Sequence, residues 1–237
     1  MQVARGWRSA AEKDFRLIVQ VGHTSPREAC RLAEHAEQIG ADAVACSAPT
    51  FFRPASLDQL VDFCSQVASA TSLPFYYYHI PVMTTVELAA SEFLAAASPR
   101  IPALAGAKFT SEDLMDYALC LQLEGGRFEV LFGRDEILLS ALVLGARGAV
   151  GTTYNFAAPL YQRMVRAYQG GDMASAQVDQ LRAMQMIRAL RRVGGGPAGA
   201  KAAMKLIGID CGPVRTPIAN VTEEQLQALR AELEQIG

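Results

Sequence analysis

The stretch Ala103–Leu114, with the sequence ALAGAKFTSEDL, joins an apolar run to a helix start and sets a lysine at the junction. The run up to Phe109 predicts a buried strand. Ser111 is a capping residue followed by two acids, which predicts that a helix begins there. In barrels and open α/β sheets, groups at the carboxyl ends of strands face the ligand crevice. The stretch therefore predicts a strand–helix unit with Lys108 at a ligand-binding edge.

Strand–helix alternation continues on both sides of this stretch. Apolar runs predict strands at Phe15–Val21, Ala43–Ser47, Pro74–Ile80, Ala103–Phe109, Phe128–Phe132 and Gly148–Thr152. Helical periodicity and capping residues predict helices at Arg27–Ile39, Leu57–Ala70, Val86–Ala97, Glu112–Leu123 and Glu136–Leu144. Such alternation is typical of a parallel sheet, either a (β/α) barrel or a doubly wound sheet. The apolar character of the strands predicts that both faces of the sheet are covered.

The last third of the chain is predicted to be helical. Its helices are expected near Ala157–Gln169, Met173–Val193, Ala198–Ile207 and Thr222–Gln235. The six predicted strands are fewer than a (β/α)8 barrel needs, and a helical segment begins directly at Met1. We therefore expect residues 1–155 to form a partial barrel and residues 156–237 to supply the last barrel helix and a C-terminal helical extension. Both parts are expected to belong to one structural domain.

Composition excludes several classes of protein. The 237 residues are 51% hydrophobic and 19% charged, which excludes a disordered chain and a disulfide-stabilised miniprotein. The formal net charge of −2 leaves no basic surplus for binding nucleic acid. The five cysteines are scattered without a CxxC motif, as expected of reduced thiols. We find no signal peptide and no apolar stretch long enough to cross a membrane, and therefore expect a cytoplasmic protein.

Lys108 is the strongest candidate for chemistry. A lysine in an apolar strand is costly when it is charged, and burial favours the neutral amine. A neutral amine can attack a carbonyl carbon and form a Schiff base. The alternative is a lysine whose stem is buried and whose ammonium group reaches solvent. Position alone leaves both interpretations open.

A second candidate is the tyrosine-rich strand end Tyr76–Pro81, YYYHIP. Strand alternation puts Tyr76 and Tyr78 on one face of the sheet and Tyr77 and His79 on the other. A phenol at a strand end can pass a proton to or from a bound carbonyl or hydroxyl group. The alternative is packing in the core, which is the commoner use of aromatic residues in strands.

Two further strand ends carry polar groups. Asp135 and Glu136, in the sequence GRDE at 133–136, can hydrogen-bond a polyhydroxylated ligand or can simply favour a helix start. Gly151–Asn155 can line a pocket or form a turn. The three histidines have no metal-ligand spacing, so no metal site is expected. The glycine-rich segment 194–201 lacks the ending of a phosphate loop and is interpreted as a hinge between helices.

Taken together, the segments YYYHIP, GAKFTSEDL, LFGRDE and GAVGTTYN resemble, in this order and spacing, the N-acetylneuraminate lyase group of the dihydrodipicolinate synthase/N-acetylneuraminate lyase family of class I aldolases. The resemblance covers essentially the whole chain. It implies a (β/α)8 barrel with a C-terminal helical extension, usually assembled as a homotetramer. It also implies cleavage of N-acetylneuraminate to pyruvate and N-acetylmannosamine through a Schiff base with pyruvate, without a metal or an organic cofactor.

The family's motifs imply roles for individual residues. Lys108 corresponds to the Schiff-base lysine, Tyr78 to the proton-relaying phenol and Thr110 to a pocket residue. The residues that correspond to the site for the sugar-like end of the substrate are Gly133, Asp135, Glu136 and Thr152. The implied partners are sialic acid or a related 2-oxo sugar acid, pyruvate and further copies of the chain. Neither nucleic acid nor a membrane is implied.

Three departures from the family pattern bear on this expectation. The Gly-[Ser/Thr]-Thr-Gly-Glu loop that grips the pyruvate carboxylate is absent, so the chain looks shortened at its N-terminus by about two βα units. This leaves open whether the shortened form is active. Met83 stands where dihydrodipicolinate synthases usually have an arginine, which disfavours that branch. Phe51 and Phe52 stand where a double tyrosine is common.

Two alternatives follow from the same residues. One is another pyruvate-dependent aldolase that acts on a different 2-oxo sugar acid, and Arg134 beside the two acids would favour an acidic substrate. The other is a non-catalytic member of the family that binds oxo acids or serves in assembly. Formation of an imine at Lys108 distinguishes an aldolase from a binding protein.

Overall fold

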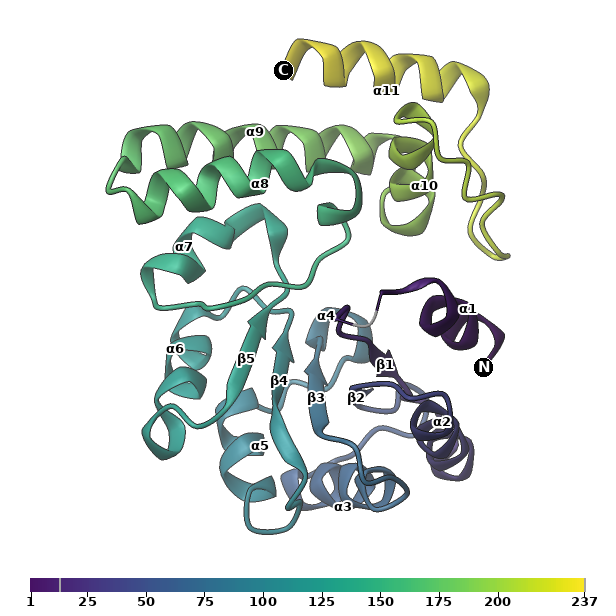
Figure 1. Cartoon of the computed structure of the whole chain (residues 1–237), viewed down its shortest axis with the longest axis vertical. Coiled ribbons are helices and arrows are strands. Elements are labelled where there is room, and N and C mark those ends of the chain that lie inside the picture. Colours follow the sequence, from purple (N-terminus) through teal and green to yellow (C-terminus); the bar gives the residue numbers. More distant parts are fainter. Residues whose placement is uncertain (13, 237) are drawn as a thin grey trace. The chain divides into compact units, whose positions relative to one another are not determined.

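The computed structural model describes residues 1–12 and 14–236 and divides into two compact units (Figure 1). The first unit comprises residues 1–133 and 145–148 and contains the sheet. The second comprises residues 134–144 together with the chain from residue 149 onward, and its elements are helical. Lys13 and Gly237 lie outside the described residues, and Gly237 is the last residue of the predicted C-terminal extension.

The first unit is built on a parallel sheet of five strands in the order β1-β2-β3-β4-β5. The strands are β1 (Ile18–Gln20), β2 (Ala43–Ser47), β3 (Phe75–His79), β4 (Leu104–Phe109) and β5 (Glu129–Phe132). Each lies within a run that the sequence predicts as a strand, which confirms five of the predicted six. The order in space equals the order in the chain, as expected when every connection passes through a crossover helix.

The prediction of a sixth strand at Gly148–Thr152 is wrong. Among the described residues of this segment, Ala149 alone forms an isolated bridge. The chain here turns around the carboxylate of Asp135, which accepts the backbone N–H of Thr153 at 2.9 Å. A Cβ on Gly151 would lie 1.6 Å from Asp135 Oδ1, so glycine is required at this close approach. The backbone donor is therefore satisfied by a side chain instead of a neighbouring strand.

Helices connect the strands of the first unit. They are α1 (Gln2–Ala10), α2 (Pro26–Gln38), α3 (Leu57–Ala68), α4 (Pro81–Thr84), α5 (Ala90–Ala97), α6 (Leu114–Gln122) and the 3₁₀ turn η1 (Leu123–Gly125). The predicted helix start at Val86 is wrong because Thr85 adopts a left-handed conformation with φ 53°. A short helix precedes that break, and α5 begins four residues after Val86. The cap of α6 is Asp113, not Ser111, since the Asp113 side chain accepts the N–H of Asp116 at 3.0 Å.

One face of the sheet packs against the helices (Figure 1). Helices α2, α5 and α6 contact β2, β4 and β5 respectively, and α3 lies between α2 and α5. The rings buried on this face are Phe75, Tyr77, His79, Phe93, Phe109, Tyr117 and Phe132. All of these rings except Phe75 form a continuous series of ring contacts with centroids 4.1 to 5.9 Å apart. Each buried aromatic side chain contributes about 1.5–3 kcal/mol, so this layer is the core of the unit.

The opposite face of the sheet is only partly covered. Gln20 and Glu129 are exposed, and Tyr76, Tyr78 and Lys108 are half-buried. The prediction that both faces are covered therefore holds for the helix-facing side alone. The two faces differ because polar side chains occupy alternate positions on this one. Such side chains hydrogen-bond water or a ligand, and burying them in an apolar core would be costly.

The second unit consists of the 3₁₀ turn η2 and five helices. They are η2 (Asp135–Ile137), α7 (Leu138–Val143), α8 (Tyr154–Gln169), α9 (Met173–Arg192), α10 (Gly196–Leu206) and α11 (Glu223–Ile236). Helix α9 is central, since α8, α10, α11, α7 and η2 all contact it. The predicted helices of this region are confirmed to within about three residues at each end. The predicted hinge at 194–201 is confirmed only at Gly194 and Gly195, because α10 already begins at Gly196. Glycines 194–196 all have positive φ.

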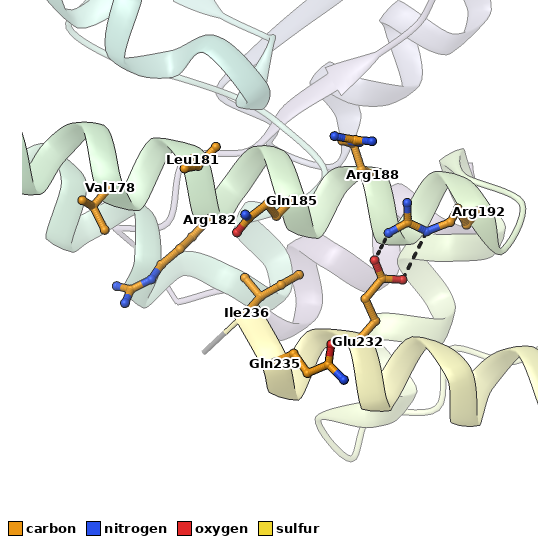
Figure 2. A pocket seen from close by; sticks show the side chains of 9 residues that line it. All are labelled: Val178, Leu181, Arg182, Gln185, Arg188, Arg192, Glu232, Gln235 and Ile236. Atoms are coloured by element: carbon orange, nitrogen blue, oxygen red, sulfur yellow. Dashed lines mark hydrogen bonds and ion pairs between the residues drawn. The ribbon is translucent and has the colours of Figure 1, made fainter.

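A groove of about 530 Å³ lies between α9 and α11 (Figure 2). Its lining residues are Val178, Leu181, Arg182, Gln185, Arg188, Arg192, Glu232, Gln235 and Ile236. Figure 2 shows the guanidinium groups of Arg182 and Arg188 pointing away from each other, while Arg192 pairs with Glu232 across the groove. The arginines do not converge on one point, and the groove is therefore not our candidate for the site.

Candidate active site

Lys108 and Tyr78 are brought together by the register of two neighbouring strands. Tyr78 on β3 is the sheet partner of Lys108 on β4, so the two side chains leave the sheet side by side on the same face. Lys108 Nζ donates a hydrogen bond to Tyr78 Oη at 3.2 Å, and it lies 4.2 Å from the centroid of the same ring. Both residues are half-buried at the carboxyl ends of their strands. An amine and a phenol are thus held within proton-transfer distance.

Gly106 allows β4 and β5 to pack closely next to this pair. It lies two residues before Lys108 on the same face, between Tyr76 on β3 and Glu129 on β5 in the sheet register. A Cβ here would lie 1.8 Å from the backbone oxygen of Glu129. The phenol of Tyr76 donates to the Glu129 carboxylate across this glycine, and burial together with Glu129 raises the pKa of that phenol. A second polar pair thus spans the sheet one layer below Lys108 and Tyr78.

Thr110 and Gly133 lie at the ends of the neighbouring strands. The N–H of Thr110 donates to the His79 carbonyl, and the N–H of Gly133 donates to the Phe109 carbonyl, both at 2.8 Å. A Cβ on Gly133 would lie 2.1 Å from Thr110 Oγ1, so the two residues touch. Thr110 Oγ1 is buried without a hydrogen-bond partner in the described part of the chain. A buried hydroxyl that lacks a partner is a place where a ligand gains a hydrogen bond.

Asp135 organises a buried network in the second unit. Its side chain accepts the N–H of Thr153 at 2.9 Å and the Thr153 hydroxyl at 2.5 Å. The same hydroxyl lies 2.6 Å from the phenol oxygen of Tyr161. Burial, and to a smaller extent Asp135, raises the pKa values of the Tyr154 and Tyr161 phenols. Both phenols therefore stay neutral near this carboxylate.

Glu136 lies in a different environment from Asp135. Its Oε1 accepts a hydrogen bond from Arg191 Nη2 on α9 at 2.8 Å and lies 3.5 Å from Arg134 Nη2. Its side chain is 21% exposed. Thr152 is exposed, and its carbonyl accepts the side-chain amide of Asn155 at 2.9 Å. The two acids are adjacent in sequence but bind different partners.

The predicted site residues fall into two sets. Lys108, Tyr78, Thr110 and Gly133 belong to the first unit, where strand register places them at neighbouring strand ends. Asp135, Glu136 and Thr152 belong to the second unit and lie in the turns before α7 and α8.

Sequence reasoning missed the residues that hold these groups in place. Tyr76 with Glu129, Thr153 with Tyr161, and Arg191 are the main examples. Strand alternation offered a signal for Tyr76, which it placed on the face of Tyr78. No local pattern could pair Arg191 with Glu136, because 55 residues separate them.

His79 is buried on the helix-facing side of β3 and does not share the face of Lys108. Burial lowers the pKa of its imidazole, while Asp116 and Asp113 act in the opposite direction. No group of three or more metal-binding side chains occurs in residues 1–12 and 14–236. Within the same ranges, no helix is both long enough and apolar enough to span a bilayer.

The sequence pattern of the dihydrodipicolinate synthetase family matches residues 1–236. The chain belongs to this family. The N-acetylneuraminate lyase of Rattus norvegicus is 41% identical over 240 residues, which cover all of this chain and 75% of the rat protein. The family assignment that the motifs predicted is thereby confirmed.

Solved structures show the same family. An N-acetylneuraminate lyase from Proteus mirabilis superposes with a TM-score of 0.96 at 37% identity and covers all of this chain and 80% of that chain. A catalytic lysine mutant of the sialic acid aldolase from Ruminococcus gnavus gives a TM-score of 0.89 at 25% identity, with coverage of 97% and 75%. The α/β class, the barrel-type fold and the C-terminal helical extension are confirmed. The predicted number of strands is the part that is wrong.

Proposed function

We propose that this chain is a class I aldolase that cleaves N-acetylneuraminate to pyruvate and N-acetylmannosamine. The observation that carries the proposal is the hydrogen bond of 3.2 Å between Lys108 Nζ and Tyr78 Oη at paired positions of β3 and β4. The N-acetylneuraminate lyases similar over the whole chain support the substrate. The catalytic lysine named for the Ruminococcus gnavus aldolase supports a covalent mechanism.

In the proposed reaction, the neutral amine of Lys108 attacks the C2 keto carbon of the open-chain sugar acid. The resulting carbinolamine loses water and gives a protonated imine. Tyr78 gives its proton to the hydroxyl group that departs as water and becomes a phenolate. The phenolate then accepts the proton of the C4 hydroxyl as the C3–C4 bond breaks, and the bonding electrons move into the iminium to form an enamine. N-Acetylmannosamine leaves with its new aldehyde at C4. The enamine takes up a proton at C3, and water hydrolyses the imine to release pyruvate.

The remaining site residues are proposed to hold the substrate. Thr110 offers a buried hydroxyl, and Gly133 leaves space beside it because a Cβ would fill that space. Asp135, Glu136 and Thr152 are proposed to receive the hydroxyl-rich end of the substrate. No step of this reaction calls for a metal or an organic cofactor. By family likeness we further propose a cytoplasmic homotetramer, which light scattering and fractionation of cells would test.

Trapping of the imine tests the mechanism directly. The full-length chain is incubated with pyruvate and reduced with borohydride, and the peptides are mapped by mass spectrometry. We expect a reduced pyruvate adduct on Lys108, no adduct in Lys108→Ala, and an undiminished adduct in Lys205→Ala, which changes a lysine of α10. A folded chain whose Lys108 stays unmodified would support a non-catalytic oxo-acid-binding protein. An adduct without cleavage of N-acetylneuraminate would support an aldolase for another 2-oxo sugar acid.

A further inference from the structure

Helix α1 is attached to the rest of the first unit by polar contacts. None of its residues is buried, so it adds no side chain to the core. Figure 1 shows α1 and α2 near β1, at one edge of the sheet. In its N-terminal half, Arg5 Nε donates a hydrogen bond to His35 Nε2 of α2 at 3.1 Å. In its C-terminal half, Arg8 Nη1 lies 3.4 Å from Asp42 Oδ2. The attachment of α1 therefore depends on the charge states of His35 and Asp42.

His35 is buried on a side of α2 that is otherwise exposed. The residue is 4% exposed, whereas Arg31 and Gln38, one turn before and after it on the same side of the helix, are exposed. Its cover therefore comes from outside α2, and Arg5 contacts its imidazole. His35 thus lies where α1 meets α2.

Arg5 requires a neutral imidazole at this contact. A guanidinium stays charged and only donates hydrogen bonds, so Nε2 of His35 is the accepting, unprotonated nitrogen. A proton on Nε2 would remove the acceptor and bring two positive charges together. Burial, and then Arg5 and the amino group of Met1, lower the pKa of His35 below its ordinary value of about 6.5.

The other titratable groups around α2 do not offset a charge on His35. Those that act on it are Arg5 and the amino group of Met1, and both are positive. Burial and then Glu34 raise the pKa of Cys30, so this acid acts on another part of α2. Most of the remaining charged groups have partners of their own, which are Glu28 for Arg31, Ser72 for Glu37, Arg100 for Asp58 and Asp62, and Arg8 and Arg16 for Asp42. The exposed residues Arg27, Glu12 and Asp14 lie at the start of α2 and beyond the end of α1, and the thiols Cys46 and Cys64 are buried.

Asp42 responds to pH in a different range. Its carboxylate accepts the backbone N–H of Leu17 at 2.8 Å and a hydrogen bond from Arg16 at 3.0 Å, in addition to its contact with Arg8. The Leu17 N–H, and then Arg16, lower the pKa of Asp42, so the carboxylate stays charged where a histidine titrates. The C-terminal half of α1 therefore stays attached when the contact at His35 is lost.

We propose that the contact between Arg5 and His35 is a pH-sensitive switch, in which protonation of His35 in mildly acidic solution detaches the N-terminal half of α1 from α2. The detached state takes up the proton more readily, because Arg5 then no longer faces the imidazole. Attachment is therefore strongest above about pH 6.5 and weakens as the pH falls below that value. The switch is independent of the proposed function, since it involves no residue of the candidate active site.

Trp7 provides the readout, because it is the only tryptophan of the chain and lies on α1 between Arg5 and Arg8. The quenching of its fluorescence by acrylamide is measured on the full chain from about pH 8 to about pH 5, and the His35 imidazole is titrated by NMR in parallel. We expect quenching to increase as the pH falls, with a midpoint below about 6.5 that matches the titration of His35. Circular dichroism at each pH distinguishes this change from global unfolding.

Three substitutions locate the effect. In His35→Gln the amide oxygen can accept from Arg5 and does not titrate, so quenching should stay at its level in the neutral range. In Arg5→Gln the amide can donate to a neutral imidazole or accept from a protonated one, so α1 should stay attached. The midpoint of the His35 titration should then rise, because a positive neighbour is gone. Arg8→Gln is the matched control on the same helix and should keep the native midpoint, because Arg8 contacts Asp42.

Two results would overturn the inference. One is constant quenching of the native chain down to about pH 5, whether or not His35 takes up a proton. The other is an increase in quenching that persists in His35→Gln or in Arg5→Gln. If His35→Gln does not fold, Arg5→Gln decides the question, because it keeps the histidine and removes the neighbouring charge.

Discussion

Lys108–Tyr78 and Glu136–Arg191 are both polar pairs, but the chain builds them by different means. The first joins two strand ends through backbone register, since Tyr78 and Lys108 are sheet partners. The second joins a turn to a helix across 55 residues of sequence. Register fixes the first pair wherever the sheet forms, whereas the second depends on where one helix docks. We therefore expect the first to tolerate little change and the second to vary more easily between related enzymes.

The largest expected effect breaks the first pair. Tyr78→Phe removes the phenol that receives the C4 proton and leaves the amine of Lys108 in place. We expect kcat for cleavage to fall by about 10²–10⁴-fold, as for loss of an acid–base group. The pyruvate adduct at Lys108 should still form. Steady-state kinetics and borohydride trapping check the two expectations.

Tyr76→Phe is the matched control for that substitution. Tyr76 lies on the same face of β3, but its hydroxyl bonds Glu129. Tyr76→Phe removes this hydrogen bond and should lower the free energy of unfolding by about 1 kcal/mol, which is typical of one hydrogen bond, with little change in kcat. An equal loss of kcat in both variants would show that Tyr78 has no special role.

Gly106→Ala disturbs the register that builds the first pair. The added Cβ would lie 1.8 Å from a backbone oxygen of β5, so β4 and β5 must separate. We expect a loss of unfolding free energy of about 1–3 kcal/mol or more, as for overpacked cores. Denaturant unfolding measures it. Gly6→Ala is the control, because that helical glycine has nothing within 4 Å, and it should be neutral or stabilising by up to about 1 kcal/mol.

The smallest expected effect concerns the network beside the second pair. Thr153→Val removes the hydroxyl shared by Asp135 and Tyr161 in a buried place. We expect a loss of unfolding free energy of about 1–3 kcal/mol, because polar groups are left buried without a partner. Thr152→Val, at an exposed position, should change stability by less than about 0.5 kcal/mol. Thermal unfolding of both variants tests this difference. Similar losses of stability in the two variants would contradict the prediction.

Much of the first pair could be predicted from local patterns. Apolar runs located five strands, and alternation placed Tyr78 apart from Tyr77. The sixth strand was predicted from the same kind of run, but only an isolated bridge at Ala149 forms there, and the Asp135 carboxylate lies against Gly151. Likewise, a left-handed Thr85 displaced the start of α5. In both cases a contact or a conformation outside the local pattern decided the outcome.

By itself, the sequence determined the strand–helix order, the family and the identity of an amine and a phenol at successive strand ends. These follow from side-chain periodicity and from motifs, which act over a few residues. Only the tertiary structure decided three hydrogen bonds. Lys108 Nζ donates to the phenol of Tyr78, the Thr153 hydroxyl donates to Asp135, and Arg191 donates to Glu136. Such contacts depend on how strands pair and where helices dock, because packing brings together residues whose separation along the chain carries no pattern.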